Sequence, residues 1–137
     1  MSHIEDLRAD REKKIARLRE LGVNPYPAKT ARTRTVAQVI EHFGSLVDSQ
    51  EQLTVTGRIM ALREHGALAF IDVQDGTGKI QGFCSREELG EEKFTMLVET
   101  MSTGDFIAVS GPAYVTKRGT QAVLVRDWQV LSKALQN

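Results

Sequence analysis

The sequence predicts a mainly β fold with α-helices, namely a five-stranded Greek-key barrel with an N-terminal helical extension and a helix between strands 3 and 4. Residues 54–85 alternate apolar and polar positions in three strands that glycine-containing turns separate. A helical stretch and two further apolar strands follow over residues 86–131. The chain has 137 residues, the size of one ordinary domain. We therefore expect residues 1–50 to form the helical extension and linker, and residues 51–137 to form the barrel.

The first helix is expected over residues 2–21. Ser2 and Glu5 form a capping box, in which side-chain oxygens satisfy free amides of the first turn. Gly22 suits the position after the helix. An approximate apolar stripe consists of Ile4, Leu7, Ile15, Leu18 and Leu21. The charged outer face fits either a solvated surface with ion pairs between neighbouring turns or an RNA contact through Lys13, Lys14 and Arg17.

A basic linker follows this helix. Residues 24–27, Asn-Pro-Tyr-Pro, cannot continue a helix, because proline lacks an amide hydrogen and restricts the residue before it. Lys29, Arg32 and Arg34 follow in a stretch without acidic residues. Contact with RNA phosphates and a flexible basic linker both fit this stretch.

A second helix is predicted over residues 36–43, capped by Thr35 and ended by Gly44. Its apolar residues recur at the spacing expected for the buried face of a helix, at Val36, Val39, Ile40 and Phe43. The polar residues 45–52 are expected to form a loop.

The three strands that follow have one apolar face and one mixed face. Alternation assigns to the inward face Val55, Gly57, Ile59, Ala67, Ala69, Ile71, Val73, Ile80, Gly82 and Cys84. It assigns to the outward face Arg58, Phe70, Asp72, Gln81 and Phe83. Phe70 is thus an aromatic residue on the face expected to be polar, and we take it as the main functional clue in the sequence.

Residues 86–100 have helical character, and their apolar positions are expected to close one end of the barrel, through Leu89, Phe94, Leu97, Val98 and Met101. A fourth strand is expected over residues 106–116, with a bulge or an unpaired edge at Pro112. A fifth is expected over residues 121–131. The order strand-strand-strand-helix-strand-strand is that of an OB-fold, whose strand 2–3 face and adjoining loops bind oligonucleotides.

The outward face carries the groups that an unstacked base requires. Phe70 offers an apolar surface for stacking, and the Gln81 amide offers both a donor and an acceptor for a uracil edge. Arg63 can reach a carbonyl or a phosphate, although strict alternation gives it core parity, so a bulge or the strand's end must turn it outward. Arg58 and Phe83 share this face. The alternatives are a phenylalanine covered by a neighbouring segment and a solvent-facing glutamine.

The composition gives no indication of a disulfide-rich, zinc-binding, secreted or membrane-spanning protein, and its charge balance is neutral. Lys+Arg and Asp+Glu both number 18, so overall charge does not indicate nucleic-acid binding and any basic surface must be local. Cys84 is the single cysteine and no zinc-binding spacing occurs, which favours a reduced, cytoplasmic setting. No signal peptide or membrane-spanning run is found. The three histidines are scattered, and residues 75–78 fit a hairpin turn better than a phosphate-binding loop.

Several segments resemble a known family: LRELGVNPYP (18–27), RTRT (32–35), VTGRIMALREHGALAFIDVQDGTGKIQGF (55–83), the Gly-Asp pair at 104–105 and LSKAL (131–135). The chain resembles the N-terminal anticodon-binding domain of bacterial-type lysyl-tRNA synthetase, a class IIb enzyme. The central block is shared with the aspartyl and asparaginyl enzymes, whereas NPYP and LSKAL are specific to the lysyl enzymes.

The resemblance implies that the barrel grips the anticodon stem-loop of lysine tRNA. The middle uridine of the anticodon would stack on Phe70 and be read by Gln81 and Arg63. Where the family has a glutamate that reads a flanking base, this chain has Thr120, followed by Gln121 as a substitute. The N-terminal helix is expected to touch the tRNA as well.

The family's three catalytic motifs, its lysine pocket and its ATP and Mg²⁺ sites lie beyond the segments matched here. We therefore expect this chain to have no catalytic residues, no cofactor and no aminoacylation activity, and to be an excised or truncated domain. The full-length family protein is a homodimer, whereas this fragment is expected to be monomeric.

Three alternative functions remain open from the sequence. The first is a general single-stranded nucleic-acid-binding OB domain. The second is a lysyl-type domain reused in a protein that does not charge tRNA, such as the soluble portion of a membrane lipid-modifying enzyme. The third is a protein-interaction module.

Overall fold

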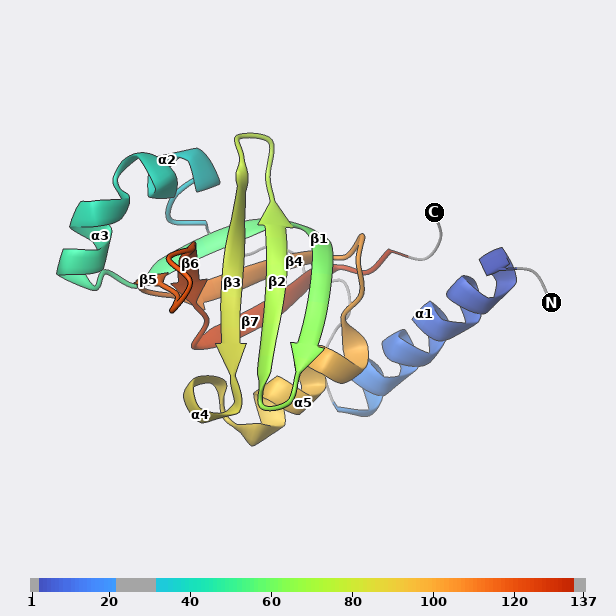
Figure 1. The fold of residues 1–137 in the computed structure, drawn as a ribbon. Helices are drawn as coiled ribbons and strands as arrows, with labels where there is room; N and C mark the ends of the chain where they lie inside the picture. The colour runs from blue at the N-terminus through green and yellow to red at the C-terminus, as the bar shows by residue number, and fades with distance from the viewer. Residues whose placement is uncertain (1–2, 22–31, 135–137) are drawn as a thin grey trace.

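The computed structural model describes residues 3–21 and 32–134 and shows a sheet with helices at its ends and side (Figure 1). The helices are α1 (His3–Glu20), α2 (Val36–Glu41), α3 (Phe43–Ser49), α4 (Arg86–Leu89) and α5 (Glu91–Thr100). The strands are β1 (Leu53–His65), β2 (Leu68–Gln74), β3 (Lys79–Ser85), β4 (Phe106–Gly111), β5 (Ala113–Val115), β6 (Gln121–Leu124) and β7 (Asp127–Ser132).

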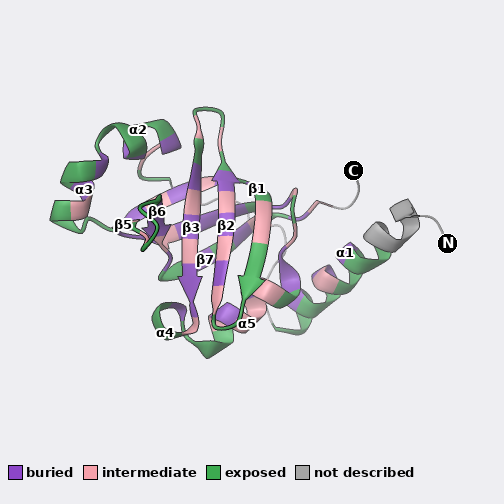
Figure 2. Ribbon diagram, in the orientation of Figure 1, coloured by how far each residue is buried: buried purple, intermediate pink, exposed green. Residues whose placement is uncertain are grey.

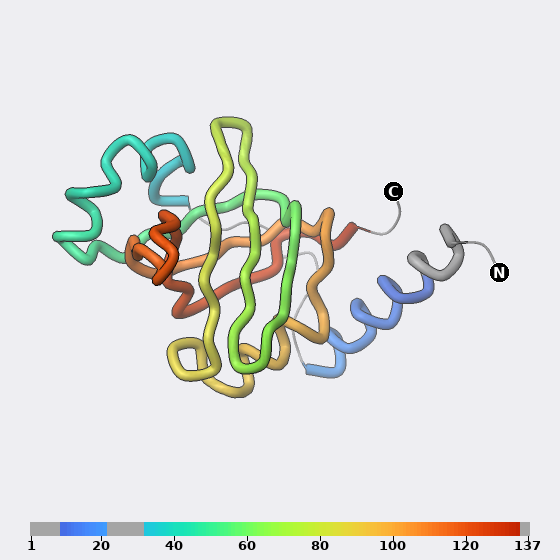
Figure 3. Tube along the Cα trace, in the orientation of Figure 1, coloured from blue at the N-terminus to red at the C-terminus, as the bar shows by residue number. Residues whose placement is uncertain are grey.

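The strands form one sheet in the order β5-β6-β3-β2-β1-β4-β7. β1, β2 and β3 are an antiparallel meander, β4 pairs with β1, and the short β6 runs parallel to β3. Figure 3 follows the chain from β3 through α4 and α5, which lie at one end of the meander, and back into β4. The predicted order of three strands, a helix and two strands is confirmed when β4–β5 and β6–β7 are each taken as one bent strand.

The structure refines the predicted set of five strands, because the fourth and fifth strands are each interrupted at a corner. Pro112 cannot donate a ladder hydrogen bond, and it separates β4 from β5. Two backbone hydrogen bonds tie the corner, Leu124 N to Pro112 O at 2.9 Å and Arg126 N to Ser110 O at 2.8 Å. The result is seven shorter strands in a sheet that has β5 and β7 as its ends.

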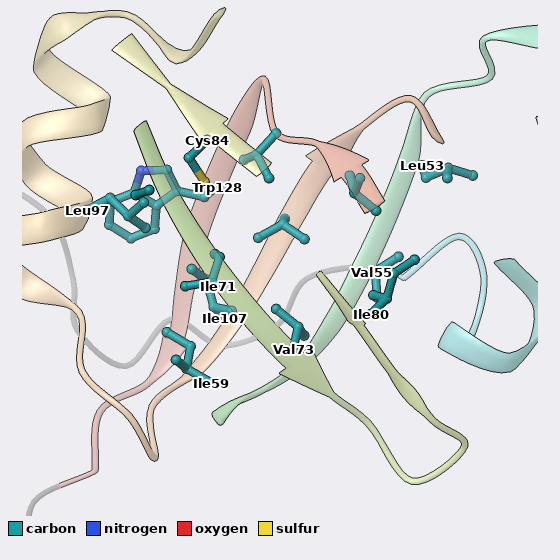
Figure 4. Close-up of a cluster of buried hydrophobic side chains, with 14 of the residues drawn as sticks. Leu53, Val55, Ile59, Ile71, Val73, Ile80, Cys84, Leu97, Ile107 and Trp128 are labelled. Atoms are coloured by element: carbon teal, nitrogen blue, oxygen red, sulfur yellow. The ribbon is translucent and has the colours of Figure 1, made fainter. Parts of the chain in front are cut away.

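The core lies on the inner face of the meander, as alternation predicts. Figure 2 shows buried positions alternating with less buried ones along β1, β2 and β3. Ile59, Ile71 and Val73 are fully buried, and Figure 4 shows them facing Ile107 of β4. Ala67 is exposed, contrary to prediction, because it lies in the turn before β2 begins. At the same inner face, burial raises the pKa of the Cys84 thiol to about 12.

Helix α1 is anchored to the body by cations as well as by apolar contacts. Ile15 and Leu18 are buried as predicted, whereas Leu21 is 37% exposed and does not continue the stripe. Lys14 Nζ donates to Met101 O at 3.2 Å and contacts Ser102 Oγ at 2.8 Å.

Arg17 Nε donates to a carboxylate oxygen of Glu99 in α5 at 3.1 Å. Lys14 and Arg17, two of the three cations considered for RNA contact, are therefore engaged within the protein, and Lys13 remains exposed. The predicted capping box at Ser2 and Glu5 lies outside the described side chains.

The predicted cap of the second helix at Thr35 is confirmed, and Gln38 completes it as a capping box. Gln38 N donates to Thr35 Oγ1 at 3.1 Å, and Thr35 N donates to Gln38 Oε1 at 2.9 Å. The helix ends at Glu41, and Ile40 is 42% exposed instead of buried.

The loop predicted over residues 45–52 is wrong, because α3 occupies most of it and contains Gly44. Phe43 and Leu46 are buried at a spacing of three, so α3 has a short apolar side despite its polar composition.

The helix predicted over residues 86–100 is two helices with a break at Gly90, whose φ of 91° lies in a region that favours glycine. The expected apolar positions of this segment are buried except Val98, which is half-buried. α5 is fastened to β7 by two hydrogen bonds, Trp128 Nε1 to Lys93 O at 3.0 Å and Lys93 Nζ to Trp128 O at 2.7 Å.

The turn between β2 and β3 is the hairpin turn that residues 75–78 predict, closed by Asp75 N donating to Gly78 O at 3.0 Å. Its carboxylate also caps α2: Asp75 Oδ2 accepts from Val36 N at 2.9 Å, while Oδ1 accepts from Thr77 N at 2.7 Å. Thr77 Oγ1 accepts from Ala37 N at 3.0 Å. The hairpin thus supplies the acceptors that the first turn of α2 requires.

Replacing this carboxylate, Asp75→Ala, is expected to lower the free energy of unfolding at neutral pH by about 1–2 kcal/mol, the usual value of a helix cap. Partial burial opposes ionisation, but hydrogen bonds from Thr77, Val36 and Gly78 outweigh it and hold the Asp75 pKa below its ordinary 3.8. The stabilisation is therefore present above that ordinary value and is lost as the pH falls through the lower folded-state pKa.

Urea unfolding of the wild type and of Asp75→Ala, measured from about pH 7 to about pH 2, checks this expectation. The difference in stability should narrow in acid. Asp48→Ala is the matched control, because Asp48 is an exposed carboxylate with no partner among the described residues. A difference in unfolding free energy between the wild type and Asp75→Ala that stays constant down to the lowest pH would contradict the capping role.

Candidate nucleic-acid interface

A hollow of about 770 Å³ lies on the outward face of the meander. Three parts of the chain line it: the end of β1, the middle of β2 and β3, and the segment from β5 to the start of β6. Phe70, Gln81 and Arg63, the three residues that sequence reasoning assigns to one base, all line this hollow. The structure therefore brings together the central predicted site.

A row of aromatic rings forms the floor of the hollow. Phe70 and Phe83 are cross-strand partners, so their side chains share the outward face. Their ring centroids are 5.4 Å apart with the planes tilted by 60°, and the ring of Tyr114 stacks on Phe83 at 5.3 Å and 27°. All three residues are half-buried. Such a surface can accept a planar base by stacking.

Gln81 stands beside this row. It pairs with Asp72 on one side and with Ala122 of β6 on the other. In the described part of the chain its side-chain amide has no hydrogen-bond partner, so both its donor and its acceptor are open to a ligand.

Arg63 reaches the same face because β1 contains a bulge. The register with β2 shifts between Ile59 and Ala61, and beyond the shift Arg63 pairs with Phe70. The expectation that a bulge turns Arg63 outward is confirmed. Its Nη2 lies 3.7 Å from Asp72 Oδ1, and its side chain is more than half exposed. This contact is long, so most donors of the guanidinium remain available.

The bulge is held in place by the turn before β4. Gly104 N donates to Ile59 O, and Ile59 N donates to Asp105 O, both at 2.8 Å. The Asp105 side chain is fully buried, accepts from Ser102 N at 2.7 Å and pairs with the equally buried Lys133. Desolvation lowers the Lys133 pKa, which the ion pair partly offsets.

The other predicted contacts are scattered. Thr120 lines the hollow, whereas Gln121 pairs with Val115 and has the strand parity opposite to that of Ala122, which shares the face of Gln81. Arg58 lies away from the hollow, with its guanidinium 5.0 Å above the ring of Phe106.

The basic linker is only partly within the described residues. Arg32 is exposed and does not line the hollow, and Lys29 lies outside the described residues. Arg34 is held by Glu51 through two hydrogen bonds of 3.0 and 3.2 Å, and this contact lowers the pKa of Glu51. The carboxylate that pairs with Arg34 is therefore not in the basic stretch itself but comes from Glu51, 17 residues further along the chain.

Sequence reasoning missed the contribution of β5 and the turn that follows it. Tyr114, Lys117 and Arg118 line the hollow together with Thr120. The available signal was a Lys-Arg-Gly-Thr turn between two apolar strands. The register of Tyr114 was not readable, because the interruption at Pro112 resets the alternation.

The charge of the hollow is positive although the chain is neutral overall. Arg63, Lys117 and Arg118 line it, against one described carboxylate, that of Glu64. Because the chain has no net charge, a basic surface had to be local, and it is formed here by the β5–β6 turn and the end of β1.

Two other kinds of site are not found in the described ranges. No group of three or more His, Cys, Asp or Glu residues within 3–21 and 32–134 is placed to hold a metal ion. None of the helices described in those ranges has the length and apolarity needed to cross a bilayer.

Comparison with known proteins gives relatives along almost the whole chain. It is 39% identical over 133 residues to a lysine–tRNA ligase of Chloroflexus aurantiacus, covering 96% of this chain and 27% of the relative. The corresponding ligase of Roseiflexus castenholzii is 40% identical over 133 residues, with the same coverage. That of Thermotoga maritima is 33% identical over 138 residues, covering 97% of this chain and 27% of the relative.

This chain therefore spans about a quarter of the length of these curated relatives. Residues 53–131, which include the whole hollow and all described strands except the last residue of β7, match the tRNA anti-codon family, described as an OB-fold nucleic acid binding domain. The match covers more than half of the chain and agrees with the order of the strands. The chain belongs to this family of OB-fold nucleic acid binding domains.

Proposed function

We propose that this domain recognises the anticodon loop of lysine tRNA on behalf of a lysine–tRNA ligase. The observation that carries the proposal is the convergence of Phe70, Gln81 and Arg63 on one hollow of the sheet face. The similarity to lysine–tRNA ligases supports the choice of tRNA, and the family match supports the anticodon loop as the part that is bound.

The three residues divide the recognition of one base. Phe70 provides the stacking surface. The Gln81 amide can pair with a base edge that carries both a donor and an acceptor, but by rotating its amide it fits cytosine as well as uracil. Arg63 only donates, so it favours the carbonyl oxygens of uracil over the amino group of cytosine. The pair together therefore selects uracil.

We further propose that catalysis takes place outside these 137 residues. Because the chain spans about a quarter of its relatives, the lysine, ATP and Mg²⁺ sites of a ligase belong to the remainder of such a protein. The domain itself is proposed to act as a monomeric RNA-binding module in the cytoplasm.

Binding of a fluorescent lysine anticodon stem-loop tests the proposal. Changing its middle uridine to cytidine is expected to weaken binding by about 5- to 150-fold, because a mismatched edge typically costs about 1–3 kcal/mol. An aspartate stem-loop, which keeps the middle uridine, should lose less affinity than the middle-base variant.

Two outcomes would contradict the proposal. Equal binding of stem-loops and of DNA and RNA homopolymers would identify a general single-strand binder. A flat titration with every RNA would instead favour a protein-interaction module.

A further inference from the structure

We propose that Asp72 is a positioning residue for base recognition: its carboxylate holds the Arg63 guanidinium beside the base and turns the carbonyl oxygen of the Gln81 amide toward it. The inference rests on the proposed function and deepens it, because it identifies the group that restricts rotation of the Gln81 amide. Without such a restriction that amide fits cytosine as well as uracil.

Asp72 lies between the two base-reading side chains on the outward face of the meander. It is the cross-strand partner of Gln81 in β3 and of Ala61 in β1. Beyond the bulge in β1, Arg63 stands opposite Phe70. Phe70 is two residues before Asp72 in β2, so Arg63 is a diagonal neighbour of the carboxylate. Ala61, directly opposite Asp72, has a side chain too small to separate the carboxylate from the arginine.

The contact with Arg63 is an ion pair that restrains the guanidinium without consuming its donors. Nη2 of Arg63 lies 3.7 Å from Oδ1 of Asp72, which is longer than a hydrogen bond. The Asp72 side chain is 22% exposed and that of Arg63 is 55% exposed. The carboxylate is therefore the more enclosed member of the pair, and the arginine is the member that lines the hollow. The carboxylate keeps the positive charge near the base, while the guanidinium hydrogens remain open to the ligand.

The same carboxylate is placed to orient the Gln81 amide. Directly opposite residues of an antiparallel pair have Cβ atoms about 4.5–5.5 Å apart, so these two side chains are close neighbours. An ionised carboxylate only accepts hydrogen bonds, so it favours the amide with its NH₂ group toward Asp72 and its carbonyl oxygen toward the hollow. In that orientation Gln81 accepts from N3–H of uracil, whereas N3 of cytosine is itself an acceptor and is repelled.

Asp72 differs from the carboxylates that hold the fold together. Asp75 accepts a hydrogen bond from Val36 N at 2.9 Å. Asp105 accepts one from Ser102 N at 2.7 Å. Among the described residues, Asp72 accepts from no backbone amide, and its ion-pair partner is the base-reading arginine. It does not itself line the hollow, so it acts on a bound base through its two neighbours.

The test measures the affinity of lysine anticodon stem-loops with uridine or cytidine at the middle position for the wild type and for Asp72→Asn. Asparagine has the shape of aspartate, but its amide both donates and accepts, so it no longer restricts Gln81. The ratio of uridine to cytidine affinity should fall by about 2- to 12-fold, the value of one hydrogen bond. Both stem-loops carry the same phosphate charge, so the general effect of removing a negative charge cancels in this ratio.

Asp127→Asn is the matched control. Asp127 is a strand aspartate whose Oδ1 lies 2.9 Å from Lys93 Nζ, and it is on β7, away from the hollow. The control removes the same charge and breaks an ion pair, but the ratio of uridine to cytidine affinity should stay that of the wild type.

Two further variants separate positioning from a structural effect. Asp72→Ala, which leaves no polar group at this position, should lower the ratio as Asp72→Asn does. Adding Asp72→Asn to Gln81→Ala should change the ratio less than Asp72→Asn changes it alone, because one of the two groups through which Asp72 acts is gone. Urea unfolding of each variant verifies that the fold is kept.

The inference is overturned if Asp72→Asn and Asp72→Ala keep the wild-type ratio, or if Asp127→Asn lowers it equally. It is also overturned if the effect of Asp72→Asn is undiminished when Gln81 is already alanine. Each of these results can occur while the wild type still prefers uridine, so they are distinct from failure of the proposed function. A wild type that does not prefer uridine would contradict the proposed function and this inference with it.

Discussion

Phe70→Ala is expected to remove specific binding of the lysine stem-loop. One stacked base contributes about 1–3 kcal/mol, so the loss corresponds to roughly 5- to 150-fold in affinity. Phe70 lies on the outward face and outside the buried core, so the fold should persist and the loss should appear in binding alone. Fluorescence titration with the uridine and cytidine stem-loops measures it, and the preference for uridine should shrink together with the affinity.

Phe106→Ala is the matched control for this variant. Phe106 is an aromatic residue with 39% exposure, and it lies on β4 below Arg58, away from the hollow. Removing it should leave RNA binding unchanged. Full binding by Phe70→Ala, or an equal loss in Phe106→Ala, would show that the base lies elsewhere on the sheet.

Gly111→Ala is expected to cause the largest loss of stability among the variants considered, about 3–5 kcal/mol. A Cβ atom at residue 111 would lie 1.8 Å from the carbonyl oxygen of Leu124 and 2.8 Å from its carbonyl carbon. Both atoms belong to the backbone, so no rotation of a side chain relieves the contact. The corner that joins β4 to β5 would have to open, with loss of the Leu124 to Pro112 hydrogen bond.

Urea unfolding with Gly44→Ala as the control checks this expectation. Gly44 lies in α3, where an added Cβ meets nothing within 4 Å. Alanine is a better helix former than glycine, so Gly44→Ala should stabilise the protein by about 0.5–1 kcal/mol. Unchanged stability of Gly111→Ala would mean that the corner is not closely packed.

The meander and its outward face were predictable because alternation with a period of two directly reports burial. Ile59, Ile71 and Val73 are buried as their parity requires, and Phe70 is outward for the same reason. The parity of Arg63 required either a bulge or the end of the strand to turn it outward, and the structure has the bulge. These inferences concern neighbours in sequence or adjacent strands.

The remaining features depend on contacts between distant residues. The Arg34–Glu51 pair and the attachment of Lys14 to Ser102 join segments that nothing in the local pattern connects. Tyr114 was missed because Pro112 interrupts the strand and resets its alternation. α3 was missed because the predicted loop begins after Gly44, and the two apolar residues left in it, Leu46 and Val47, are adjacent and show no helical period.

The buried carboxylate of Asp105 also links the orientation of Arg63 to parts of the chain that never line the hollow. The Asp105 carboxylate accepts a hydrogen bond from Ser102 N, and the Ser102 hydroxyl accepts one from Lys14 of α1. The same carboxylate forms an ion pair with Lys133, which follows β7. The backbone carbonyl of Asp105 accepts a hydrogen bond from Ile59 N, and Ile59 lies immediately before the bulge in β1. We therefore expect a displacement of α1 or of the chain after β7 to reach Arg63, the residue proposed to read the middle uridine, through a single backbone hydrogen bond. This junction would then connect neighbouring segments mechanically to the proposed base recognition.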